Sequence, residues 1–115
     1  MAYTELTRAD GQLVCRCRVA ISFASRFCGL MGVAQLPPGS GLLLPGTRSV
    51  HTHFMRFPID VVFLDSELRI VSIVQALRPW RMARAKAAKS VLELAAGNCE
   101  RLELAEGDIL REVAL

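Results

Sequence analysis

Long hydrophobic segments are absent from this sequence. No stretch approaches the roughly 18 consecutive apolar residues of a transmembrane helix. Residues 1–10 also lack the apolar core of about 7–15 residues that signal peptides contain. We therefore expect a cytoplasmic protein with no membrane partner.

Cysteine is present but lacks the spacing of a metal-binding framework. The four cysteines are Cys15, Cys17, Cys28 and Cys99, and they do not form the paired CxxC motifs of a zinc site. Because cytoplasmic thiols stay reduced and free cysteine behaves as a small apolar residue, we expect free, partly buried thiols. A soft-metal or redox role for Cys15 and Cys17, and a nucleophilic role for Cys28, are the alternatives.

Acidic residues are missing between residues 68 and 92, whereas the tail from Glu93 holds six of the 11 acids. Trp80 lies in the acid-free segment and offers a stacking surface among cations. The segment contains a candidate anion-binding set: Arg78, Arg81, Arg84, Lys86 and Lys89. A nucleic-acid contact, a protein-partner surface and a solvated loop that offsets the acidic tail are the alternative interpretations.

The rest of the composition is that of an ordinary globular domain. The chain has 115 residues, 52% of them hydrophobic, and a formal net charge of +3. A chain of this length buries one core rather than two. We therefore expect a single domain over residues 1–115.

Alternation of apolar and polar residues predicts several strands. Residues 12–20 place Cys15 and Cys17 on one face of a strand. Further strands are predicted over residues 50–57, 59–64, 69–74, 91–94 and 109–113, with a short one after Gly41. Asp65-Ser-Glu fits a hairpin turn between the 59–64 and 69–74 strands.

Helical signals are short and few. Ser22 can cap a helix in which Phe23, Phe27 and Leu30 recur at helical spacing. Residues 95–104 fit a short helix or an irregular turn. Residues 77–90 are polar and basic without a sustained apolar period, which predicts a long loop.

Four segments together resemble the DUF192 family of small bacterial and archaeal proteins. They are RFCGLMG at 26–32, MRFPIDVVFLD at 55–65, LELAAG at 92–97 and Gly-Asp at 107–108. The resemblance implies a compact, β-rich α+β domain and, as the family's label says, no established activity. We therefore expect a curled sheet or partly open small barrel with one or two short helices, in a bacterial protein.

His51 and His53 are the strongest candidates for chemistry. Alternate residues of a strand share a face, so two imidazoles there can converge on one cation. Asp60, Asp65 and Glu93 are the carboxylates that could complete a metal site with them. Met55 would share the histidine face, which favours hydrogen-bonded histidines in apolar surroundings instead.

Asp60 opens an otherwise apolar strand, where burying a carboxylate is costly without a cation or backbone donors. Arg26 and Arg56 are the candidate cations. We favour a buried ion pair, with ligand recognition by Arg56 as the alternative.

These observations favour a non-catalytic accessory module that binds a small molecule or a protein, with no cofactor. Its candidate ligand-binding residues are His51, His53, Met55, Arg56, Asp60 and Trp80. One alternative is a metal-assisted hydrolase that activates water with His51, His53 and a carboxylate. The other is an anion or nucleic-acid binder that acts through residues 78–89.

Overall fold

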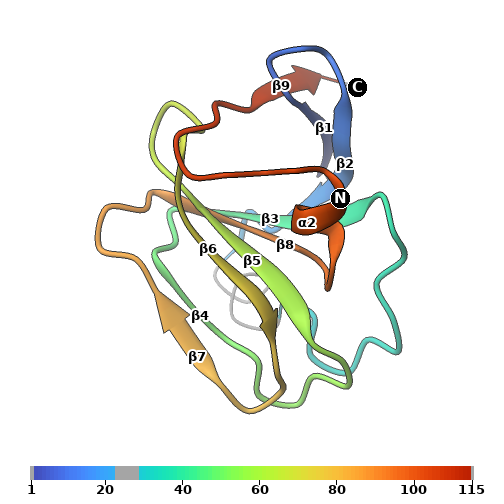
Figure 1. Ribbon diagram of the computed structural model, residues 1–115. Helices are drawn as coiled ribbons and strands as arrows, with labels where there is room; N and C mark the ends of the chain where they lie inside the picture. The colour runs from blue at the N-terminus through green and yellow to red at the C-terminus, as the bar shows by residue number, and fades with distance from the viewer. Residues whose placement is uncertain (1, 23–28, 115) are drawn as a thin grey trace.

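The computed structural model describes residues 2–22 and 29–114 (Figure 1). The elements in chain order are β1 (Ala2–Thr7), β2 (Leu13–Val19), β3 (Ser40–Pro45), β4 (Ser49–His51), β5 (Ile59–Leu64), β6 (Ile70–Leu77), β7 (Met82–Arg84), β8 (Ser90–Ala95), α2 (Asn98–Arg101) and β9 (Arg111–Ala114). No helix within these ranges is long and apolar enough to cross a membrane.

The main sheet is curled and almost closes on itself. Its strand order is β6-β5-β8-β3-β2-β1-β9, and only the β2–β3 pair is parallel. The two ends of the sheet meet where Arg69 bridges Ile109 and the Ile70 N–H donates to the Asp108 carbonyl at 2.8 Å. This partly open barrel confirms the predicted β-rich fold class.

A second, two-stranded sheet lies away from the closing edge. Strands β4 and β7 pair antiparallel, with Ser49 opposite Arg84 and His51 opposite Met82. In Figure 1 this sheet is at the lower left, whereas β1 and β9 are at the top. The molecule therefore has two distinct ends.

Strand β5 is buried along its whole length because both faces of the main sheet are covered. Val62 packs with Leu92 in the core cluster inside the curl. Val61 and Phe63 pack with Met55 in the cluster beneath the second sheet. Full burial of one such side chain contributes roughly 1.5–3 kcal/mol, so β5 is a rigid base for the loops that follow β4 and β6.

The central hairpin and the late elements agree with the sequence prediction. Strands β5 and β6 pair antiparallel, and the Asp65 N–H donates to the Arg69 carbonyl at 3.0 Å across the turn. Strand β8 and helix α2 also form where the pattern placed them. The helix predicted from Ser22 lies largely outside the described residues.

Two predictions near the second sheet are wrong. The strand expected over residues 50–57 ends at His51, because the chain turns and the Met55 N–H donates back to the Thr52 carbonyl at 3.2 Å. The loop expected over residues 77–90 contains β7. Its residues are mostly exposed, so this strand lacks the apolar alternation that reveals others.

The cysteines depart from the expected free thiols. Cys15 and Cys17 lie on one face of β2, as predicted, and both are fully buried, but they form a disulfide. Cys99 is free and buried.

Candidate recognition surface

Thr52 joins two loops that lie far apart in the sequence. Its side chain is fully buried. Its hydroxyl donates to the Arg78 carbonyl at 2.6 Å and accepts from the Arg81 N–H at 2.8 Å. Its backbone carbonyl accepts from the Trp80 N–H at 3.0 Å, and its own N–H donates to the Arg81 carbonyl at 2.8 Å. Thr52 thereby holds residues 78–81 against residues 52–55.

The two loops bring four aromatic rings into one row. Phe54 and Trp80 have ring centroids 4.7 Å apart at 60°. His53 lies 5.3 Å from Trp80, and His51 lies 5.1 Å from His53. Such spacings are those of interacting aromatic pairs, so the loops form a continuous ring surface.

Phe54 and Trp80 are exposed although their backbones are strained. Their exposed fractions are 60% and 55%, and their φ angles are 63° and 64°. A left-handed backbone costs a non-glycine residue roughly 1–2 kcal/mol, and these rings recover little of it by burial. Strain of this kind gathers at functional sites.

Cations flank these rings in the sequence. Arg56, Arg78, Arg81 and Arg84 are exposed, and none of them forms an ion pair within the described part of the chain. The Arg81 guanidinium donates to the Trp80 carbonyl at 3.3 Å. The candidate cations Lys86 and Lys89 are exposed as well. The surface thus combines aromatic rings with positive charge that no described acid neutralises.

An open hollow lies on the second sheet beside the rings. Its volume is about 590 Å³, and its lining residues are Arg48, Ser49, Met82, Ala83 and Arg84. Met82 is 71% exposed and pairs with His51 across the sheet. Because Met82 lines the hollow and His51 belongs to the row of rings, this pair connects the two.

The sequence-predicted ligand residues divide into two groups. His51, His53, Arg56 and Trp80 belong to this surface. Met55 does not, because it is 5% exposed and packs in the core. The chain turns at Thr52, so Met55 no longer follows His51 and His53 along one strand face.

Asp60 is a structural carboxylate rather than part of the surface. It is fully buried, and it accepts N–H groups from Ala76 at 2.9 Å, Gly97 at 3.1 Å and Cys99 at 2.9 Å. The expected ion pair is not formed with Arg56, which is exposed, since backbone donors satisfy the charge. The other candidate cation, Arg26, lies outside the described residues. Burial first, and then the charge and hydrogen bond of Asp60, raise the pKa of the Cys99 thiol to about 12, which keeps it protonated.

Glu93 is buried and only 3% exposed. Its Oε1 has no hydrogen-bond partner among the described residues. Desolvation raises its pKa from 4.5 to about 7. Within the described residues, no three His, Cys, Asp or Glu side chains are grouped so as to hold a metal ion, so Asp60 and Glu93 do not complete a site with the histidines there.

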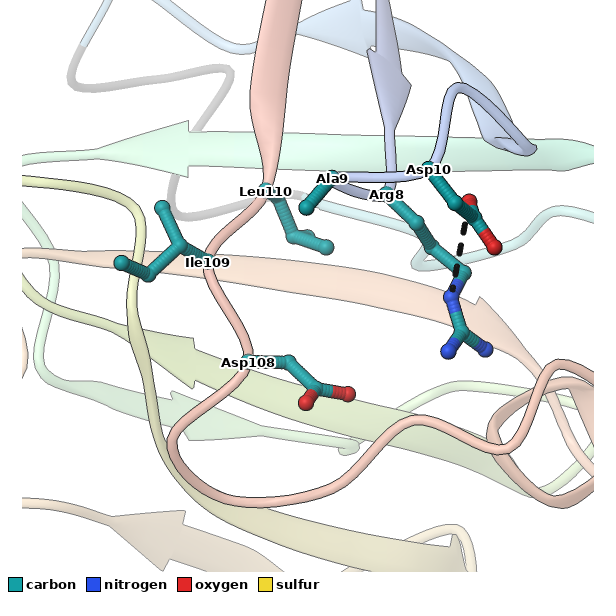
Figure 2. Close-up of a pocket in the computed structure, with 6 residues that line it drawn as sticks. All are labelled: Arg8, Ala9, Asp10, Asp108, Ile109 and Leu110. Atoms are coloured by element: carbon teal, nitrogen blue, oxygen red, sulfur yellow. Dashed lines mark ion pairs between the residues drawn. The ribbon is translucent and has the colours of Figure 1, made fainter.

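A second pocket, of about 180 Å³, lies between the β1–β2 turn and the segment before β9 (Figure 2). The Arg8 guanidinium pairs with Asp10 at 4.0 Å and donates to the Leu102 carbonyl. The Asp108 carboxylate accepts the Ala105 N–H at 3.0 Å. These polar groups therefore already have partners within the chain.

Residues 5–111 match the DUF192 family model, described as "Uncharacterized ACR". The chain belongs to the DUF192 family. A UPF0127 protein from Thermococcus kodakarensis is 38% identical over 98 residues, which cover 81% of this chain and 62% of that protein. The match thus spans about three fifths of that relative. Curated UPF0127 relatives come from Thermococcus and Pyrococcus, which are archaea, so they overturn the expectation of a specifically bacterial protein.

Two crystal structures share the DUF192 fold seen here. One, from Sinorhizobium meliloti, is described as a candidate transcription regulator; it has a TM-score of 0.85, 26% identity and covers 99% of this chain and 95% of that chain. The other is a protein of unknown function from Novosphingobium aromaticivorans, with a TM-score of 0.82, 22% identity and coverage of 95% and 83%. The second likeness shows the fold alone.

Three residues of this surface were not identified from the sequence: Thr52, Phe54 and Met82. Thr52 gave no signal, because its partners lie 26 and 29 residues away. Phe54 was assigned to a predicted strand and Met82 to a predicted loop, and the neighbouring sequence does not indicate that either is exposed. Trp80, the single aromatic residue of the acid-free segment, indicated the surface but none of these three residues.

Proposed function

We propose that this chain is a non-catalytic binding module that recognises its partner through a recognition surface made of residues 51–56 and 78–84. One observation carries the proposal: Phe54 and Trp80 present exposed rings from strained backbones that Thr52 holds in place. Rigid aromatic side chains supply large contact area and lose little entropy on binding, and they dominate interface energies.

The neighbouring cations support recognition rather than hydrolysis. Arginine is enriched with aromatic residues in the centres of interfaces. The carboxylate invoked for a hydrolase, Asp60, is instead occupied by three backbone N–H groups. The Sinorhizobium relative is described as a candidate transcription regulator, and regulators act by binding, which is consistent with this proposal.

Trp80 is the single tryptophan of the chain, so its fluorescence reports this surface directly. We would titrate the full chain with three probes: AMP, the oligonucleotide dT12, and a tryptophan-free acidic peptide containing tyrosine. We expect saturable change with at least one probe, weakened by Phe54→Ala. A flat Trp80 signal with all three would contradict the proposal.

A further inference from the structure

We infer that the recognition surface binds single-stranded nucleic acid, with bases on the aromatic rings and phosphates on the arginines. This inference rests on the proposed function and names its partner. Binding of a single strand has three requirements: rings that stack on planar bases, cations that bind negatively charged phosphates, and a surface long enough for an extended chain.

The rings meet the first requirement. Bases stack on exposed aromatic side chains whatever their sequence, because every base has a π face. Trp80 and Phe54 are more than half exposed, and His53 extends the row beside Trp80. The backbone bonds of Thr52 fix these rings before a ligand arrives, so little ordering is needed on binding.

The cations meet the second requirement. Arg56, Arg78 and Arg81 flank the rings in sequence, and Arg84 follows on β7. All four are exposed and without an ion pair in the described ranges. Guanidinium groups bind phosphate oxygens bidentately and also stack on bases.

The second sheet meets the third requirement. Strand β7 adds roughly 10 Å of extended backbone beyond the rings. Met82 and Arg84 are both exposed there and line the hollow of about 590 Å³ together with Arg48. A short oligonucleotide can therefore follow the surface from the rings to Arg84, whereas a mononucleotide reaches only part of it.

The distribution of acidic residues favours polyanion binding near the second sheet. Five acidic residues lie in the segment from α2 to β9, which runs above β4 and β7 in Figure 1: Glu100, Glu103, Glu106, Asp108 and Glu112. Two further acids, Asp60 and Glu93, are buried in the fold. A phosphate chain is therefore attracted to the second sheet and repelled from the acidic segment between α2 and β9.

Two other ligands fit less well. Bases in a duplex are already stacked on one another, and the described helix α2 has four residues, which is too short to read a major groove. An acidic peptide would satisfy the arginines but leave the exposed rings without stacked partners unless it also carried aromatic residues.

The test is anisotropy of fluorescein-labelled dT12 with the full chain at 50 mM salt. We expect saturable binding, weaker binding of the same sequence as a duplex, and weaker competition by AMP than by unlabelled dT12. If all four arginines contact phosphates, the log–log salt slope is roughly −3. Trp80→Ala and Phe54→Ala should each weaken binding roughly 5- to 150-fold, whereas Trp80→Phe keeps most of it.

Matched charge variants separate this site from general attraction. Arg81→Gln should weaken binding and reduce the salt slope by roughly 0.7, whereas Arg101→Gln on α2 should leave both unchanged. Circular dichroism confirms that each variant is folded. Equal effects of Arg81→Gln and Arg101→Gln would overturn the inference.

The remaining outcomes are also decisive. If dT12 does not bind but the acidic peptide saturates the Trp80 signal, the inference fails and the proposed function stands. If AMP competes as well as dT12 does, the site is for a mononucleotide and the inference fails. If no probe affects Trp80, both fail.

Discussion

The ring centroid of Phe54 lies 4.7 Å from that of Trp80, and the two residues share a left-handed backbone with φ near 63°. Each residue reaches this conformation in a different loop, and Thr52 links the loops. A pair of bulky residues held in this way, with their rings exposed, gains too little from packing to account for the strain.

Replacing Phe54 separates backbone strain from ring contact. Phe54→Ala loses the ring but keeps the Cβ, whereas Phe54→Gly loses both. We expect Phe54→Gly to have a free energy of unfolding about 1 kcal/mol above that of Phe54→Ala, because glycine adopts positive φ freely. Urea denaturation measures the difference. Equal stability of the two variants would show that the backbone is unstrained.

Removing the Thr52 hydroxyl should loosen the recognition surface. Thr52→Val keeps the shape but leaves the Arg81 N–H and the Arg78 carbonyl without this partner. We expect a loss of about 1–3 kcal/mol in the free energy of unfolding and a weaker near-ultraviolet signal from Trp80. Thr47→Val is the control, because the half-buried Thr47 hydroxyl makes one local bond to Pro45 at 3.1 Å. An equal loss of unfolding free energy in both variants would contradict the proposal that Thr52 holds the two loops together.

Most strands of the main sheet were predictable because their pattern is local, whereas β1 (Ala2–Thr7) was not predicted. Strand β5 reads as an apolar run and β2 as an alternation, and burial follows both patterns. The end of β4 was not predictable. It depends on hydrogen bonds from Thr52 to a loop 26 or more residues away, and no local preference encodes them.

The candidate site was predictable only in part for the same reason. His51, Arg56 and Trp80 stood out by residue type, but Met55 was placed on the surface by a strand register that stops at His51. The charge of Asp60 indicated a buried partner. Its partners are backbone N–H groups at residues 76, 97 and 99, which a search for cations could not find.

Asp60 should be among the most sensitive polar positions of the fold. Asp60→Asn removes the charge and replaces one accepting oxygen by a donor, against three N–H groups from β6 and the start of α2. We expect a loss of roughly 2–3 kcal/mol in the free energy of unfolding, measured by urea denaturation. Asp65→Asn is the control, since Asp65 accepts two N–H groups in an exposed turn. A smaller loss at Asp60 than at Asp65 would contradict the assignment.

Glu93 should make stability depend on pH. Its cross-strand neighbours are the apolar residues Leu42 and Val61. Arg18 lies opposite Leu42 on the next strand. Its guanidinium donates to the Gly29 carbonyl rather than to Glu93. Because burial raises the pKa of Glu93 from 4.5 to about 7, the folded chain keeps a proton that the unfolded chain releases. The free energy of unfolding therefore falls as pH rises from 4.5 to 7, by about 3 kcal/mol in total.

Glu93→Gln removes this dependence, because glutamine does not titrate. We expect the stability of Glu93→Gln minus that of the unsubstituted chain to increase by about 3 kcal/mol between pH 4 and pH 8. Comparing two pH values cancels the constant cost of a buried amide, and urea denaturation at each pH supplies both terms. Glu100→Gln on the exposed face of α2 should show far less change. A flat difference for Glu93→Gln would mean that the carboxyl group is solvated or paired in the folded protein.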